Sequence, residues 1–180
     1  MDNSSLYEKL IADMAGGDRD AFRALYEATR DAVYGFALSI LRHREDAEDV
    51  MHDTYIKIYT GAGAYSPQGK PLSWMLTIVR NLSLNKLRDE RRAENVPDDE
   101  LPEQADLTDV IEDASTHIVL ASAMSVLTRE EREIVVLHAL TGYRHREIAE
   151  ILEMPQSTVL SRYNRALKKM KKEINGKGDA

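Results

Sequence analysis

Apolar residues recur at the spacing of an α-helix along most of the chain, and no segment shows the alternation of a β-strand. In the N-terminal half, this pattern predicts a helix over residues 6–15 and a second one after an N-cap at Asp18, whose apolar pattern resumes over 32–41. Two further helices are predicted over residues 45–61 and 72–92. Gly, Ser, Pro and Tyr in the intervening segment predict a loop.

The C-terminal part is punctuated as three short helices. Thr128 and Glu131 have the spacing of a capping box, and Gly142 stands where a left-handed C-cap is expected. A second helix is predicted over residues 144–152 and, after a break, a third over about 156–172. Two short helices joined by a tight turn are typical of a helix-turn-helix, which places its second helix in the DNA major groove.

The last predicted helix separates apolar from polar positions. The residues expected to point inward are Val159, Tyr163, Ala166, Leu167 and Met170. The opposite face carries Gln156, Ser157, Leu160, Ser161, Asn164, Arg165 and Lys168. Its short polar groups can reach base edges, and the lysines at 168, 169, 171 and 172 can hold phosphates. The alternative is a solvated helix whose lysines favour the negative end of the helix dipole, but the preceding helix and turn favour DNA binding.

Charge divides the chain into blocks. The formal charge is −7 in total, and it is distributed as −4 over residues 1–79, +3 over 80–93, −9 over 94–128 and +3 over 129–180. The acidic stretch includes Pro97 and Pro102 and is typical of a solvated, flexible linker. We therefore expect an all-α protein of two helical domains, residues 1–93 and 115–175, joined by an acidic linker over 94–114.

Composition narrows the possible functions. The chain has no cysteine, which excludes disulfides, thiolate metal sites and a cysteine nucleophile. No stretch approaches the roughly 20 apolar residues of a membrane span, and no signal-peptide layout is present, so a cytoplasmic protein without membrane insertion is expected. Five histidines invite a metal or hydrolase interpretation, but there is no nucleophile motif and no phosphate-cradling glycine loop. We expect no enzyme, no metal, no cofactor and no small-molecule substrate.

Several motifs, in order along the chain, resemble those of bacterial sigma factors. Residues 46–50 and 55–59 resemble region 2.2, and residues 74–81 with 87–88 resemble regions 2.3 and 2.4. Residues 127–133, 147–152, 157–162 and 165–166 resemble region 4. This order, with regions 1 and 3 missing, is similar to that of the extracytoplasmic-function (ECF) sigma factors. The resemblance covers residues 5–92 and 115–173.

The resemblance implies that the region 2.2 helix docks on core RNA polymerase. The candidate residues on that helix are Asp46, Glu48, Asp49 and Asp53. An acidic patch of this kind can attract a basic surface of a partner, which raises the rate of association and sets the orientation of the complex. The alternative is that these carboxylates only favour the positive end of the helix dipole on a solvated face. The family also implies an anti-sigma factor as a partner, in addition to core polymerase and promoter DNA.

In the family, the −10 promoter element is read as partly single-stranded DNA with a flipped base, whose extraction costs a few kcal/mol. The candidate residues are Tyr65, Lys70, Arg80, Asn81, Lys86 and Arg88. Tyr65 offers an aromatic face in the loop, although it could equally pack on its own domain. Asn81 can donate and accept at a base edge. Trp74 is expected to belong to the core.

The resemblance assigns the −35 element to the last helix. The candidate residues are Gln156, Ser157, Ser161, Asn164, Arg165 and Lys168, whereas Arg162 is expected to support the fold. The chain departs from the family at Glu153, where glycine is usual in the turn, and at Leu160, where a basic residue is usual.

Two other functions stay open at this point. A stand-alone helix-turn-helix regulator would bind DNA without polymerase, and a sigma-like decoy would bind an anti-sigma factor without reading promoters. We also hypothesise that the acidic linker lies against the basic blocks in the free protein and weakens DNA binding.

Overall fold

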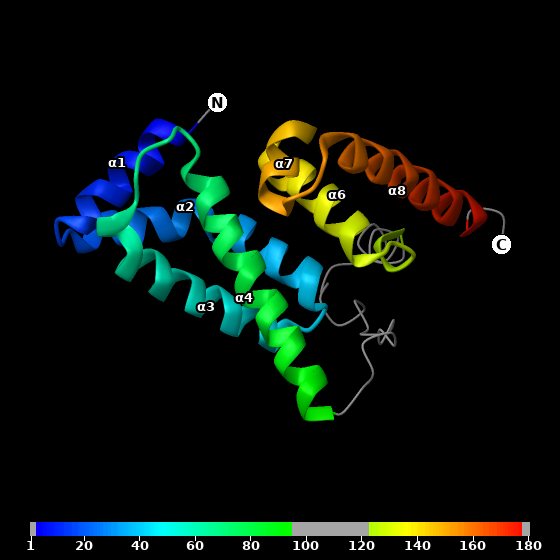
Figure 1. Ribbon diagram of the computed structural model, residues 1–180, viewed down its shortest axis with the longest axis horizontal. Coiled ribbons are helices and arrows are strands. Elements are labelled where there is room, and N and C mark those ends of the chain that lie inside the picture. The colour runs from blue at the N-terminus through cyan, green and yellow to red at the C-terminus, as the bar shows by residue number, and fades with distance from the viewer. Residues whose placement is uncertain (1–2, 95–122, 178–180) are drawn as a thin grey trace.

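Figure 1 shows the computed structural model of the protein, which describes residues 3–94 and 123–177. Within these residues every long regular element is an α-helix, as the sequence predicts. The helices are α1 (Ser4–Ala15), α2 (Arg19–Leu41), α3 (Arg44–Gly61), α4 (Pro71–Glu94), α6 (Arg129–Thr141), α7 (His145–Leu152) and α8 (Gln156–Lys177), with a short 3-10 helix η1 (Ala62–Ala64). Residues 95–114 of the expected linker lie outside the described residues.

The predicted helix ends are confirmed where the sequence carries a capping residue. The Asp18 carboxylate accepts hydrogen bonds from the backbone N–H groups of Asp20 at 2.8 Å and Ala21 at 3.2 Å. Thr128 and Glu131 form the reciprocal capping box, with distances of 3.0 and 3.3 Å. Gly142 ends α6 in the left-handed conformation with φ 69°. Each cap satisfies backbone groups that the helix itself leaves unpaired.

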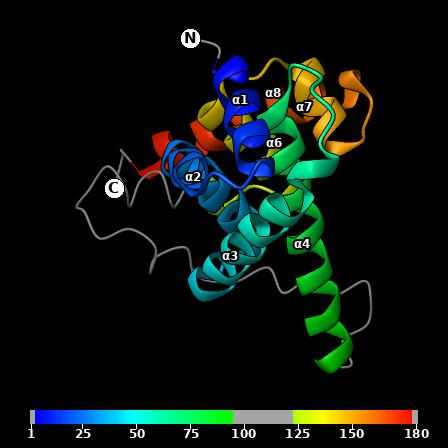
Figure 2. The ribbon, with the colours of Figure 1, turned by 90° about the vertical axis from the view of Figure 1, so that its left-hand side faces the viewer.

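In the N-terminal domain, α2 packs against α1, α3 and α4 (Figure 2). The side chains that fill the core are fully buried and include Leu25, Phe36, Ile58, Met75 and Leu76. They come from three different helices at helical spacing, so each helix buries one apolar stripe and leaves its polar side to water.

The C-terminal domain is a helix-turn-helix of α7 and α8 on the supporting helix α6. Its core includes Ile134, Leu137, Ile148 and Val159. Glu153 occupies the turn with φ 53°, a left-handed conformation that costs about 1 kcal/mol for a residue other than glycine. The turn geometry usual for glycine is therefore adopted by a glutamate. One expectation is wrong: Leu167 is 43% exposed, because the strip of α8 that packs on the domain is centred on Val159 and Ala166.

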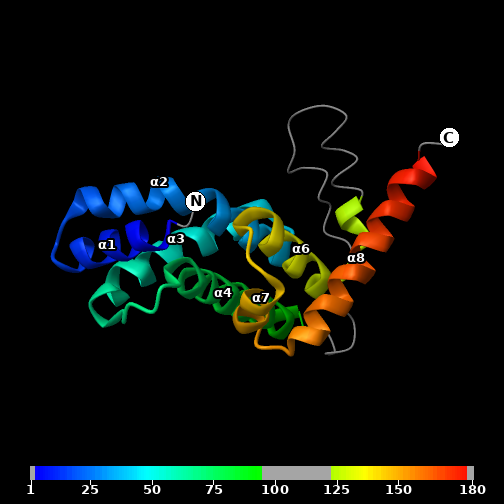
Figure 3. The same ribbon diagram turned by 90° about the horizontal axis from the view of Figure 1, so that it is seen from above.

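The two domains pack directly against each other. Helix α6 lies along α2, and α7 lies against α4 (Figure 3). Gly35 of α2 allows this approach, because a Cβ atom there would lie 2.9 Å from the Cδ1 atom of Leu140. The buried Arg132 side chain of α6 donates from Nε to the backbone oxygen of Ser39 at 3.1 Å. Apolar side chains from both domains form one continuous buried cluster.

Candidate polymerase and nucleic-acid interfaces

The acidic residues expected to meet polymerase line the first half of α3. Glu48, Asp49 and Asp53 are exposed, whereas Asp46 is partly buried. Lys86 of α4 lies between the two helices, with Nζ 2.7 Å from Asp46 and 3.1 Å from Asp49. Hydrogen bonding to Asp46 raises the pKa of Lys86. The structure thus places Lys86, which the sequence assigned to the −10 element, within the acidic cluster.

A shallow groove runs between α3 and α4 beside this cluster. It is lined mainly by charged and polar side chains, among them His52, Asp53, Asn85, Asp89 and Glu90. No group of three or more metal-ligating side chains comes together in the part of the chain that the structure describes. The groove therefore continues the acidic surface.

Tyr65 lies in the loop between η1 and α4 and packs on a neighbour. Its ring centroid is 4.7 Å from that of Trp74, with a tilt of 45°. Burial, and then the negative charge of Glu8, raise the pKa of the Tyr65 phenol. Trp74 is itself partly buried against the core of the N-terminal domain. Tyr65 therefore packs on its own domain, as one of its two interpretations expected, and its stacking on a base stays a prediction.

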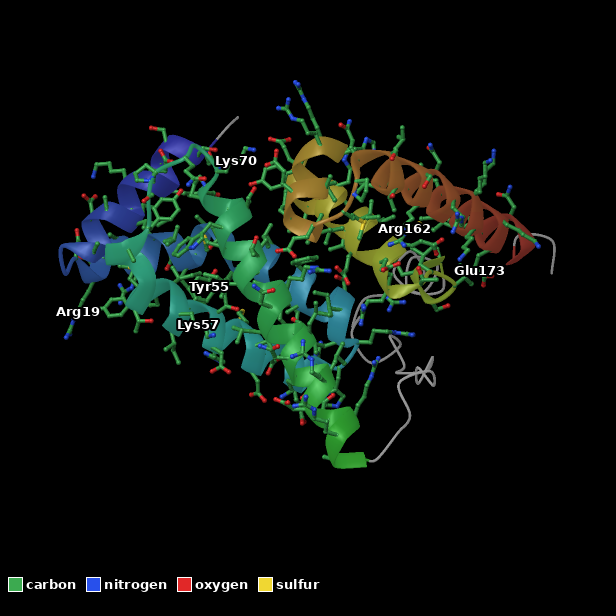
Figure 4. All side chains as sticks on the ribbon, viewed as in Figure 1. Arg19, Tyr55, Lys57, Lys70, Arg162 and Glu173 are labelled. Carbon is green, nitrogen blue, oxygen red and sulfur yellow. The ribbon has the colours of Figure 1, made fainter. Side chains whose placement is uncertain are left out.

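Lys70 and Arg80 are both engaged by the C-terminal domain. Lys70, at the start of α4, forms an ion pair with Glu150 of α7 (Figure 4). The Nε atom of Arg80 lies 3.2 Å from the Glu133 carboxylate of α6, and these two side chains are 17% and 1% exposed. Burial raises the pKa of Glu133, and the charges of Arg80 and Arg129 counteract that rise. The sequence pattern did not indicate either of these two carboxylate partners.

Asn81 and Arg88 are exposed on α4. Asn81 follows Arg80 directly and lies outside the contact with Glu133. Of the six candidate −10 residues, these two are thus open to solvent, two are held by the C-terminal domain, one is in the acidic cluster and one is stacked on Trp74.

The six candidate −35 residues all lie on the exposed side of α8. Gln156, Ser157, Ser161, Asn164, Arg165 and Lys168 are exposed, while Val159 and Ala166 on the opposite side are fully buried. Leu160 is 45% exposed on the same side as the polar residues. The opposite side of α8 packs on α6 and α7.

Two basic residues of α8 serve the fold. Arg162 pairs with Glu130 of α6, as expected for a supporting residue (Figure 4). Lys169 was expected among the phosphate-binding lysines, but its Nζ lies 2.8 Å from Glu131 of the capping box. Lys169 therefore fixes the far end of α8 to the start of α6. Helical spacing places Lys169 at the edge of the buried side of α8. This spacing was the signal in the sequence that could have indicated its structural role.

The sequence also left the packing around the helix-turn-helix unassigned. The rings of His138 and His145 stack with centroids 5.4 Å apart, and both meet Tyr163 edge-on. The Nδ1 atom of His138 lies 2.8 Å from the backbone oxygen of Tyr143. These histidines hold α6, α7 and α8 together, which accounts for them without a metal site.

Two family models match the chain. Sigma-70 region 2 matches residues 25–93, and Sigma-70 region 4 matches residues 117–170. The ECF RNA polymerase sigma factor SigM of Mycobacterium tuberculosis is 31% identical over 158 residues, which cover 88% of this chain and 79% of that protein. The chain belongs to the ECF RNA polymerase sigma factors. The ECF sigma factor SigK of Mycobacterium sp. (strain KMS) is 27% identical over 171 residues, 90% of this chain and 87% of that protein.

Solved structures share the fold of this ECF sigma factor. CnrH, in complex with the cytosolic domain of CnrY, is 23% identical, with a TM-score of 0.68 over 94% of this chain and 97% of that chain. The sigma factor RpoE of Bartonella quintana, in complex with the anti-sigma factor NepR, is 21% identical, with a TM-score of 0.73 over 86% of this chain and 96% of that chain. The predicted all-α fold with two sigma domains is confirmed. Among the described helices, none has the length and apolarity to cross a bilayer.

Proposed function

We propose that this ECF sigma factor binds core RNA polymerase and divides promoter recognition between its two domains. The region 4 domain reads the −35 element with α8, and the region 2 domain reads the −10 element with α4 and the preceding loop. The observation that carries the proposal is the two-sided character of α8: all six candidate −35 residues are exposed on one face, while the opposite face is buried.

Helix α8 has the chemistry for reading a major groove. Ser161, Asn164 and Arg165 offer hydrogen-bond groups to base edges along one face, and arginine favours guanine where it can bond in two places. Lys168 lies one turn further on and suits a phosphate. Leu160 adds an apolar side chain on this face, which fits the methyl group of a thymine. We therefore expect Leu160, in place of a basic residue, to change the preferred base more than it lowers the affinity for DNA.

The region 2 domain supplies a second surface for single-stranded DNA. Tyr65 on Trp74 offers a stacking face, worth about 1–3 kcal/mol per base. Asn81 is exposed further along α4, seven residues after Trp74, and Arg88 extends a positive track toward the end of the helix. Arg80 can join this track only after Glu133 releases it, whereas the Lys70–Glu150 pair is exposed, so Lys70 can exchange its carboxylate partner for a phosphate. Contact of Arg80 with the −10 element therefore requires the two domains to separate.

Core polymerase is proposed to dock on α3. Glu48, Asp49 and Asp53 present exposed carboxylates that can steer a basic surface into register. Lys86 neutralises part of this patch next to Asp46, so it shapes the polymerase-binding surface and is the weakest of the −10 candidates. The proposed localisation is the cytoplasm, where polymerase and promoter DNA are found, and no cofactor is needed.

The remaining proposals concern regulation. RpoE of Bartonella quintana was solved with an anti-sigma factor. We propose such an inhibitor for this chain as well, bound to the surfaces that meet polymerase and DNA. Residues 94–114 are proposed to be the linker that joins the two domains. The decoy hypothesis loses one of its two supports, because Glu153 adopts the left-handed turn that glycine usually provides.

The test is run-off transcription with purified bacterial core polymerase, the full chain and the DNA upstream of its own gene. We expect specific initiation at this promoter that is lost with Asn81→Ala, because that variant prefers a different −10 sequence, and retained with Glu27→Ala, which changes an exposed residue of α2. Binding to core without initiation at any promoter of a broad panel would favour the decoy. Absence of core binding would favour the stand-alone regulator.

A further inference from the structure

The loop that carries Tyr65 has little regular structure of its own. Residues 66–69 are all exposed, and Gly69 has a left-handed backbone with φ 71°. At its first end, the Tyr65 N–H donates to the Ala62 oxygen at 3.2 Å, which closes η1, and the Tyr65 hydroxyl is hydrogen-bonded to the backbone of Gln68. A segment of this kind adopts many conformations unless another part of the protein holds it.

A single carboxylate from α1 holds both ends of this loop. The Oε1 atom of Glu8 accepts a hydrogen bond from the backbone N–H of Gly69 at 2.7 Å. The same oxygen lies 3.5 Å from the hydroxyl of Tyr65. Glu8 is 57 residues from Tyr65 and 61 residues from Gly69 along the chain, so this contact exists only because α1 packs beside η1.

The contact with Glu8 fixes the ring of Tyr65 as well as the backbone of the loop. With its hydroxyl next to Glu8 and its ring 4.7 Å from Trp74, Tyr65 is held at two points. A held ring presents one face in one orientation, which reduces the entropy lost when a base stacks on it. A base in a pocket of fixed shape is also discriminated from other bases more sharply than one in a pocket that adapts.

Glu8 is unsuited to contact DNA itself. Its negative charge repels phosphates, and the oxygen that faces the loop already accepts from the backbone of Gly69. Lys70, the next residue, is the group suited to a phosphate. The position of Glu8 behind the loop therefore fits a residue that acts through Tyr65.

We propose that Glu8 is a positioning residue for −10 recognition: it sets the shape of the loop and the orientation of Tyr65, and thereby the base selectivity of the region 2 domain. This inference rests on the proposed function of the loop. Helix α1 lies outside residues 25–93, the segment that matches Sigma-70 region 2. The inference thus extends the −10 recognition apparatus of this chain to a helix that the family match does not include.

The test compares Glu8→Ala with Glu8→Gln, in which the amide oxygen can still accept from Gly69. The matched control is Glu27→Ala, which removes the same charge from the exposed surface of α2. Each full-length variant is combined with core polymerase and a promoter library randomised at the −10 and −35 elements. Sequencing the transcribed templates gives the base preference at every position, and circular dichroism reports whether each variant is folded.

For Glu8→Ala we expect the preference at one or two −10 positions to fall about fivefold, the effect of one net hydrogen bond, with an unchanged −35 profile. Glu8→Gln and Glu27→Ala should keep the wild-type profile. The proposal is overturned if Glu8→Ala leaves the −10 profile unchanged, if Glu8→Gln loses selectivity equally, or if Glu8→Ala does not fold. Failure of the wild-type chain to initiate would instead contradict the proposed function, and this inference would fall with it.

Discussion

Arg80 of α4 and Glu133 of α6 form an ion pair across the interface of the two domains, with 3.2 Å between Nε and Oε2. Glu133 is almost fully buried, and Arg129 of its own helix lies 3.4 Å away on the other side. A buried carboxylate depends on such partners, because its loss of hydration is otherwise uncompensated. Arg80, which is expected to bind DNA, therefore also holds the two domains together.

Arg80→Ala is expected to weaken the packing of the domains by about 3 kcal/mol, because Glu133 then remains buried with one partner fewer. The exchange Arg80→Met with Glu133→Leu should restore most of the loss, since it removes both charges together. Small-angle X-ray scattering measures the effect as an increase in the radius of gyration for the single variant only. An unchanged radius in Arg80→Ala would show that this ion pair contributes nothing to closure.

Side chains of different size at position 35 test the same interface between the two domains. An alanine there meets only the flexible end of Leu140, and it favours the helical state of α2 by about 1 kcal/mol over glycine. Gly35→Ala should thus raise the thermal stability, whereas Gly35→Leu should force α6 away from α2 and expand the molecule. Equal scattering profiles for the two variants would contradict the close approach of Gly35 and Leu140.

The pH dependence of stability depends on Glu131. Burial alone would raise the pKa of this carboxyl, but Lys169 and the N–H of Thr128 outweigh burial and lower the pKa below the ordinary value of 4.5. A lowered pKa means that the contribution of the charged group is present above pH 4.5 and is lost as the pH falls through the pKa of the folded state.

Glu131→Gln keeps an acceptor for Thr128 and removes the charge that binds Lys169. The variant should be less stable than the wild type by about 1 kcal/mol at neutral pH, and the difference should shrink as the pH falls below about 4.5. Urea unfolding at a series of pH values measures it. A difference that is constant with pH would rule out the proposed charge effect.

Leu160→Lys tests the departure from the family in the −35 helix. The exposed side chain of α8 gains a charge that can hold a phosphate, so affinity for promoter DNA should rise and become more salt-dependent, with a slope steeper by about one. Selectivity for thymine at the contacted position should fall. Filter binding of holoenzyme at several salt concentrations measures both. Ala28→Lys on the exposed side of α2 is the control for added charge.

Much of the fold can be predicted from the sequence because its signals are local. The spacing of apolar residues and the caps at Asp18, Thr128 and Gly142 each act within one or two helical turns. The exposed face of α8 follows from the same periodicity, since burial of Val159 and Ala166 determines which side chains face outward. Leu167 lies at the border of these two faces, where periodicity decides least.

The pairings between distant helices could not be predicted in this way. Glu8 with Gly69, Lys70 with Glu150 and Arg80 with Glu133 depend on how whole helices pack, and a charged residue at an exposed helical position gives no indication of its partner. The family matches assign residues 25–93 to region 2 and residues 117–170 to region 4, but they leave these contacts open as well. Of the contacts between distant helices, only the one at Gly35 had a signal in the sequence. A lone glycine within a helical pattern often marks a place where another part of the chain packs closely.

The division of promoter recognition between the domains is tested most directly by the base preferences of two variants. Holoenzymes with Arg165→Ala and with Asn81→Ala are each presented with the library randomised at both promoter elements. We predict that Arg165→Ala changes the preferred bases at −35 alone and that Asn81→Ala changes them at −10 alone. If either variant altered the other element, or if both left the two profiles unchanged, the assignment of −35 to α8 and −10 to α4 would be contradicted.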